Sequence, residues 1–295
     1  PFIVGGGGCS GIRIDSPRCE TDTLGEAMSS GHPTRLRHER LPKGYVLDGR
    51  YEIVRAIGAG GFAYVYEANQ LNIERPVAIK VLSPPRSLDD KEHYFARFVR
   101  EAKLAAQIQH PNVVTIHDYG VADEHPFIAM ELLHGRELRH ELRTYGPMDP
   151  ARALPLFVEC LDALSEAHRR KIVHKDLKPS NLFLSDPGGR REMLRVLDFG
   201  VARAQESESL TQSGRVYGTM RYLAPEYLRK QMVTPALDVY QMGLILVEAL
   251  SARPAIVADD HLVCITAHFL GELEIPEVLL EGPLGPVLQK ALAPM

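Results

Sequence analysis

The sequence has no marked excess of charge of either sign. Its formal net charge is −4 over 295 residues. Nucleic-acid-binding domains usually have a strongly basic face. We therefore expect no nucleic-acid partner, and the 45% of apolar residues is enough for one large domain or two small lobes with their own cores.

Long apolar runs and cysteines are also scarce. A membrane helix needs about 18 consecutive apolar residues, and the longest candidate, residues 239–250, is interrupted by Gln241 and Glu248. The four cysteines are too scattered for a disulfide framework, which favours a reducing compartment. We expect a cytoplasmic domain without a membrane segment. Because the chain starts at Pro1 rather than methionine, we also expect a fragment or processed product, and membrane tethering through regions outside it stays open.

Residues 1–44 differ in composition from the rest of the chain. Consecutive glycines, four prolines and no sustained period predict a disordered tail. A zinc site made by Cys9, Cys19, His32 and His38 is the alternative, but nine residues separate the two cysteines where a zinc finger uses two to four. A lipidation site at Cys9 is disfavoured because no charged leader with an apolar stretch precedes it.

The pattern becomes β-rich from Tyr51 onward. Short apolar or alternating runs predict strands at residues 51–57, 63–68, 75–82, 113–118 and 126–132. Apolar residues at three- and four-residue steps predict one long helix over residues 90–109. Residues 45–133 are therefore expected to form a small antiparallel lobe with a single long helix.

Residues 134–295 have a mainly helical pattern. Asp149 and Pro150 suit the start of a helix that runs to about Arg170, with Pro155 expected to bend or restart it. The apolar face expected for this helix consists of Leu154, Phe157, Leu161 and Leu164. A second apolar helix is expected over residues 235–252. The fold class is thus α+β with two lobes.

A glycine-rich turn at residues 58–61 joins the first two predicted strands. Glycines allow a tight hairpin to bring backbone N–H groups close to phosphate oxygens. Such turns are common, but Lys80 strengthens this reading because it lies on an otherwise apolar strand and must find an anion if buried. The alternatives are a solvent-facing lysine for Lys80 and a merely solvated carboxylate for its candidate partner, Glu101.

The most informative segment is the polar run between two apolar stretches at residues 172–184. It contains Asp176 and Asn181, and Asp198 follows a second apolar stretch. Two carboxylates and an amide at strand ends suit a magnesium ion and a hydroxyl nucleophile.

On these motifs the sequence resembles the eukaryotic-type protein kinase family, and most of all its bacterial serine/threonine branch. The resemblance covers residues 48–295, with five motifs in the expected order. It implies a bilobal kinase fold and transfer of the ATP γ-phosphate to serine or threonine hydroxyls of proteins. The residue roles that follow are those that the resemblance implies.

The resemblance implies a nucleotide site. Gly58, Gly60 and Gly61 would cover the phosphates, and Lys80 would contact the α- and β-phosphates and pair with Glu101. The residues expected around adenine are Ile57, Val65, Ala78, Met130, Glu131, Leu133 and Phe183, with Met130 as gatekeeper and the backbone of Glu131 and Leu133 as hydrogen-bonding groups.

The resemblance also implies the catalytic and metal-binding residues. Asp176 would accept or orient the proton of the substrate hydroxyl, and Lys178 would stabilise the transferred phosphate. Asn181 and Asp198 would hold Mg²⁺, with Mn²⁺ as an alternative ion. Asp238 would anchor the catalytic loop from the apolar helix. Lys178 and Thr219 match the serine/threonine type, and residues 218–219 and 224–226 resemble a peptide-docking shelf.

Three features concern regulation and departures from the family pattern. Thr211 and Ser213 resemble an autophosphorylation site, which implies kinase–kinase dimers, with basic partners at Arg100, Lys175 and Arg203. Lys175 stands where the family usually has arginine and lacks the planar guanidinium that grips phosphate, so loop phosphorylation is expected to matter less. Ala63 replaces the last glycine of the loop, with modest effect expected.

The C-terminal residues 285–295 resemble the penultimate helix of the fold. We therefore expect the chain to stop before the last helix and Glu226 to lack its usual arginine partner. Two other functions were weighed. A pseudokinase scaffold usually loses Lys80, Asp176 or Asp198, all of which are present. A small-molecule phosphotransferase would not need the docking shelf.

Overall fold

The computed structural model describes residues 40–60, 63–82, 91–186, 191–199, 220–258 and 260–293. The side chains at 91–93, 97 and 261 lie outside this description. Of the disordered tail expected at residues 1–44, the part up to residue 39 also lies outside it, including Cys9, Cys19, His32 and His38, whereas residues 40–44 are described. The described chain already packs at Leu41, which is buried and whose amide donates to the Tyr66 hydroxyl at 2.9 Å.

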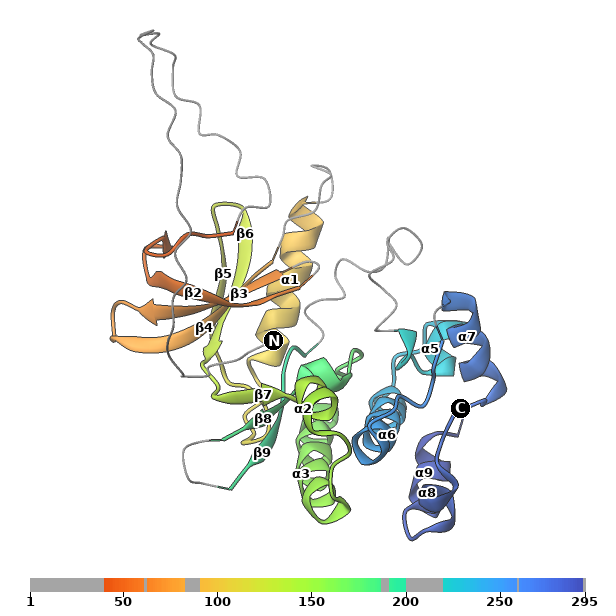
Figure 1. The fold of residues 1–295 in the computed structure, drawn as a ribbon. Helices are drawn as coiled ribbons and strands as arrows, with labels where there is room; N and C mark the ends of the chain where they lie inside the picture. Colours follow the sequence, from red (N-terminus) through yellow and green to blue (C-terminus); the bar gives the residue numbers. More distant parts are fainter. Residues whose placement is uncertain are drawn as a thin grey trace, which may run out of the picture.

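The first lobe is a twisted antiparallel sheet flanked by one helix (Figure 1). Its strand order is β1-β2-β3-β4-β6-β5. The strands are β1 (Val46–Leu47), β2 (Tyr51–Ala59), β3 (Ala63–Gln70), β4 (Arg75–Leu82), β5 (Ile116–Ala122) and β6 (His125–Glu131). Helix α1 (Lys91–Ala105) packs through Phe98 and Ala102, and it ends before the expected residue 109 because turns lead the chain into β5.

The second lobe is mainly helical, with a small three-stranded sheet at the junction of the lobes (Figure 1). Its elements are β7 (Gly135–Glu137), α2 (Leu138–Tyr145), α3 (Pro150–Arg169), the 3₁₀ turn η1 (Pro179–Asn181), β8 (Leu182–Ser185), β9 (Met193–Val196), α5 (Pro225–Lys230), α6 (Pro235–Ser251), α7 (His261–Leu270), α8 (Glu277–Glu281) and α9 (Gly285–Ala291). The predicted α+β bilobal class is confirmed. Within the described ranges, no helix combines the length and hydropathy needed to cross a membrane.

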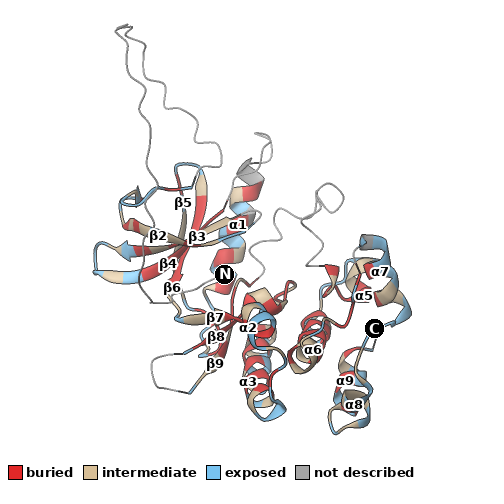
Figure 2. Cartoon of the chain, in the orientation of Figure 1, coloured by how far each residue is buried: buried red, intermediate tan, exposed pale blue. Residues whose placement is uncertain are grey.

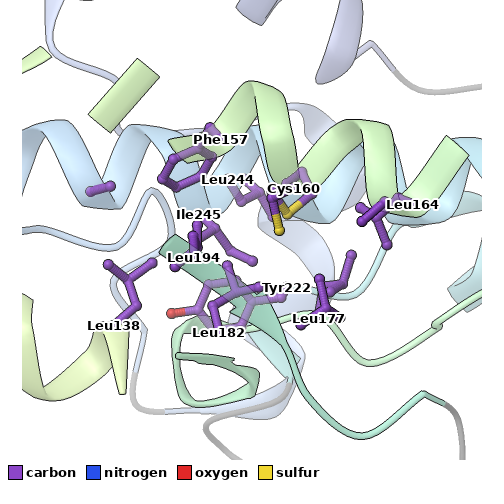
Figure 3. Close-up of a cluster of buried hydrophobic side chains, with 14 of the residues drawn as sticks. Leu138, Phe157, Cys160, Leu164, Leu177, Leu182, Leu194, Tyr222, Leu244 and Ile245 are labelled. Carbon is purple, nitrogen blue, oxygen red and sulfur yellow. The ribbon is translucent and has the colours of Figure 1, made fainter. Parts of the chain in front are cut away.

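The core of the second lobe forms where α3 meets α6 and the strands β8 and β9. Figure 3 shows Phe157, Cys160 and Leu164 of α3 facing Leu244 and Ile245 of α6. In Figure 2 the buried residues concentrate along these helices and along the strands of the first sheet. The expected apolar face was partly wrong, because Leu161 is 41% exposed and Ala163 lies in the core.

Helix α3 begins as expected, since the Asp149 side chain accepts a hydrogen bond from the Ala151 amide at 2.7 Å. It then continues through Pro155, whereas the sequence suggested a bend or restart. An internal proline costs about 3 kcal/mol, and each fully buried Leu or Phe contributes about 1.5–3 kcal/mol. The buried stripe that includes Leu156, Phe157 and Leu164 therefore outweighs the lost hydrogen bond.

Candidate active site

A buried carboxylate on α6 fixes the backbone of the catalytic loop. Asp238 is fully buried. Its Oδ2 accepts from the His174 amide at 2.8 Å, and its Oδ1 accepts from the Lys175 amide at 2.9 Å. His168 Nε2 lies 2.7 Å from Oδ2. The predicted anchoring role of Asp238 is confirmed by these contacts.

The loop needs this support because its backbone is locally strained. Lys175 has a φ of 72°, in the left-handed region that costs a residue other than glycine about 1–3 kcal/mol. Gln241, one turn after Asp238, accepts from the Leu177 amide at 3.0 Å and donates to the Lys175 carbonyl at 3.2 Å. Four backbone groups of the loop are thus held by two side chains of one helix.

Asp176, the expected catalytic carboxylate, has two unlike oxygens. Oδ2 receives Lys178 Nζ at 2.8 Å and Asn181 Nδ2 at 3.2 Å. Asn181 Nδ2 also donates to the Asp176 carbonyl at 2.7 Å. Oδ1 is buried and has no hydrogen-bond partner in the described part of the protein. A buried acceptor normally has a partner, so this oxygen keeps an unused capacity to accept a hydrogen bond.

Asp198 faces the lysine of the first lobe. Its Oδ2 lies 2.7 Å from Lys80 Nζ, which is itself buried on β4. Burial acts to raise the pKa of Asp198, but the Lys80 ammonium together with His174 and Lys178 outweighs it, so the net pKa lies below the ordinary value. The two motifs also touch through His174, whose ring packs on Phe199 with centroids 4.8 Å apart.

The predicted pair between Lys80 and Glu101 is not formed in this conformation. Among the residues that the structure describes, the ion-pair partner of Lys80 is Asp198. The ammonium is already neutralised there, and engaging Glu101 as well requires α1 or the Lys80 side chain to shift. In kinases the pair between the strand lysine and the helix glutamate belongs to the active arrangement.

The residues expected to hold a metal lie next to each other. The Leu197 amide donates to the Asn181 carbonyl at 2.9 Å, which places Asn181 beside the residue that precedes Asp198. The donor set is a carboxylate plus an amide oxygen, and oxygen donors of this kind suit Mg²⁺. The available residues therefore fit a magnesium ion.

The expected adenine-binding side chains form one apolar cluster between the lobes. Ile57, Ala78, Met130 and Phe183 are buried in it, and Val65 and Leu133 pack against it. Sequence reasoning missed three further members, Val114, Leu132 and Leu197.

The glycine-rich loop leaves room above this cluster. The Gly60 amide donates to the Ala63 carbonyl at 2.8 Å and closes the hairpin. Neither Gly58 nor Gly60 has a positive φ, and a Cβ on Gly58 would meet nothing closer than 3.6 Å. The described backbone therefore does not itself require glycine at these two positions. Gly61 lies outside the described residues.

An ion pair that sequence reasoning missed connects the lobes at the hinge, where the chain passes from the end of β6 into the second lobe. Arg195 on β9 pairs with Glu131 at the end of β6, and its Nη2 donates to the Val113 carbonyl at 2.9 Å. Glu131 Oε1 also accepts from the Thr115 amide at 2.7 Å. The sequence offered one signal for this pair, because Arg195 is a charged residue between Leu194 and Val196 in a short strand. A charged residue on an apolar strand is also what singled out Lys80.

The regulatory residues are only partly described. Arg100 is exposed on α1, and Lys175 lies in the anchored loop. Arg203, Thr211, Ser213 and Thr219 lie outside the described residues. Glu226 is 5% exposed, and no hydrogen bond or ion pair reaches its carboxylate within the described part of the chain.

Comparison with protein families agrees with this geometry. A family model described as the protein kinase domain matches residues 51–274. The chain belongs to the protein kinase family. By homology it is a serine/threonine protein kinase domain.

Similar proteins come from bacteria. Serine/threonine-protein kinase PknD of Mycobacterium tuberculosis is 36% identical over 83% of this chain and 36% of its own length. PrkC of Bacillus subtilis is 38% identical over 70% of this chain and 31% of its own. The chain thus spans about a third of these relatives. The crystal structure of the M. tuberculosis PknI kinase domain superposes with a TM-score of 0.66 at 26% identity, covering 87% of this chain and 92% of that one.

The hinge ion pair leads to a double-mutant prediction. Arg195→Met and Glu131→Gln should show a coupling free energy of about 1–2 kcal/mol, because both side chains are partly buried. The measurement is equilibrium urea unfolding followed by two probes, which checks for a single transition. The control is the Arg169–Glu166 pair on the surface of α3, which should couple by about 0.5 kcal/mol or less. Equal coupling in the two pairs would contradict the prediction.

Proposed function

We propose that this domain transfers the γ-phosphoryl group of ATP to serine and threonine hydroxyls of proteins. The observation that supports it best is the state of Asp176. One of its oxygens is held by Lys178 and Asn181, and the other is buried and has no hydrogen-bond partner among the described residues. A carboxylate arranged in this way suits a group that accepts or orients a proton during attack.

The neighbouring side chains support complementary roles. Lys178 lies 2.8 Å from Asp176 and is close enough to stabilise the transferred phosphate. Asn181 and Asp198 would hold Mg²⁺, or Mn²⁺ in its place, and a bound divalent ion neutralises phosphate charge. The cluster around Ala78 and Met130 suits the adenine ring because it is apolar and draws on both lobes.

Lys80 must exchange partners when nucleotide binds. It is now paired with Asp198, whereas its proposed role is to contact the α- and β-phosphates and pair with Glu101. The described conformation therefore corresponds to a state in which the phosphate-binding lysine and the metal-binding carboxylate neutralise each other. Nucleotide and metal together would separate the two charges.

The main test compares the wild-type protein with Asp176→Asn in the presence of labelled ATP, Mg²⁺ and a generic basic protein. The variant should transfer at least about 100-fold less phosphate, because the amide cannot accept the hydroxyl proton. Asp162→Asn, an exposed change on α3, is the matched control and should keep wild-type activity. Label should appear on serine and threonine.

Other outcomes separate the alternatives. If the wild type binds ATP but labels no protein under any condition, the pseudokinase scaffold is favoured. If it consumes ATP only when a small hydroxyl compound is supplied, a small-molecule phosphotransferase is favoured. Equal labelling by wild type and Asp176→Asn would contradict the assigned role of Asp176.

Autophosphorylation of Thr211 and Ser213 is the second part of the proposal. A phosphate on either residue would be attracted by the exposed Arg100 and by Lys175, which would order the loop. Because autophosphorylation in this proposal takes place between two copies of the protein, the rate of self-labelling should rise with protein concentration. Thr211→Ala combined with Ser213→Ala should abolish most self-labelling and lower activity on other proteins. Unchanged activity and unchanged self-labelling in this double variant would contradict the proposal.

A further inference from the structure

The segment that leads into α5 is held by a histidine on α7. Met220, the first residue of this segment that the structure describes, is buried. Its carbonyl oxygen lies 2.9 Å from Nε2 of His268, which is 1% exposed. The other ring nitrogen, Nδ1, lies 2.8 Å from the hydroxyl of Tyr240 on α6.

These contacts define one protonation state of the ring. A carbonyl oxygen can only accept, so Nε2 must carry the proton and donate to Met220. Nδ1 then accepts from the Tyr240 hydroxyl. Burial lowers the pKa of His268 to about 4, so the ring is neutral at physiological pH and both contacts persist. The arrangement is a chain of two hydrogen bonds from α6 through α7 to Met220.

The same segment is fixed at the two following residues by other parts of the lobe. Arg221 Nη2 donates to the Ala258 carbonyl at 3.1 Å. The Tyr222 hydroxyl donates to Glu248 Oε2 on α6 at 2.5 Å. The apolar side chains beneath form a small cluster of Met220, Leu223, Ile256, Ala258 and Cys264.

Of these supports, the His268 contact alone joins the backbone of residues 220–224 to α7. It also lies near Glu226, the buried carboxylate at the start of α5. Burial, and then the charge of Glu226, raise the pKa of Tyr240. Tyr240 therefore keeps its proton and remains a hydrogen-bond donor to His268.

We propose that His268 is a positioning residue for the protein substrate. By fixing the Met220 carbonyl, it sets the backbone of residues 220–224, which lead into residues 224–226, the described part of the shelf expected to dock a substrate polypeptide. This inference rests on the proposed protein kinase function and deepens it. His268 touches neither the nucleotide cluster nor Asp176, so its effect should fall on protein substrate and not on ATP.

The test measures kcat and KM for a generic basic protein and for ATP in three variants. His268→Leu removes both hydrogen bonds and leaves the Met220 carbonyl without its donor. It should raise KM for the protein about tenfold and leave KM for ATP within about twofold. His268→Gln keeps an amide donor and should restore most of the affinity for the protein that His268→Leu loses. Tyr240→Phe keeps the histidine donor to Met220 but removes the hydroxyl that holds the ring proton on Nε2. It should therefore raise KM for the protein only about threefold.

A purely structural role gives a different pattern. If His268→Leu lowers kcat and raises both KM values in parallel with a loss of folded protein, or leaves both KM values unchanged, the inference is overturned. If His268→Leu does not fold, the test uses the ratio of KM for the protein to KM for ATP in His268→Gln and Tyr240→Phe. A wild-type ratio in both of these variants overturns the inference. Failure of the proposed function itself would appear separately, as absence of protein labelling by the wild type.

Discussion

The organisation of the site depends on the buried carboxylate of Asp238. Placing a charge in the protein interior costs several kcal/mol unless hydrogen bonds replace the lost water. Here two backbone amides of the catalytic loop and His168 supply them. The same bonds hold Lys175 in a left-handed conformation that the loop would not adopt by itself. Folding of α6 and the geometry of the catalytic loop are therefore coupled through one side chain.

Two ion pairs that involve proposed site residues connect the lobes. Lys80 with Asp198 joins β4 to the segment after β9, and Arg195 with Glu131 joins β9 to the hinge. The first pair involves the groups proposed to bind phosphate and metal, so ligands compete with it. The second pair involves groups with no assigned role in catalysis, so it can persist when nucleotide binds. Of these two ion pairs, one shares its groups with the proposed ligands and the other does not.

The sequence was most informative where the functional residues lie close together along the chain. Asp176, Lys178 and Asn181 lie within six residues, and their motif predicted the family, while the contacts among them came only from the structure. Five strands of the first sheet and the three long helices were also predictable, because hydrophobic period and a local cap define them. The strand expected at residues 113–118 is found at Ile116–Ala122. The assignment of Leu161 to the core was wrong. The buried face of α3 depends on where α6 and the neighbouring strands pack, and hydrophobic period does not reveal these positions.

The features that escaped prediction join residues far apart in the chain. Arg195 and Glu131, like His268 and Met220, meet only after the lobes have folded. The absence of the Lys80–Glu101 pair is of another kind, because it depends on which conformation the domain adopts. A motif specifies which charges are available, whereas the position of α1 decides which of them meet.

The most direct test of this account is the turnover of Asp238→Asn. Asparagine keeps one carbonyl oxygen but presents an amide donor to a backbone donor of the loop. The account predicts a fall in kcat of about 100-fold or more, with ATP affinity within about threefold of wild type because the adenine cluster lies elsewhere. A folded Asp238→Asn protein with a kcat close to that of the wild type would contradict the central role given to this carboxylate.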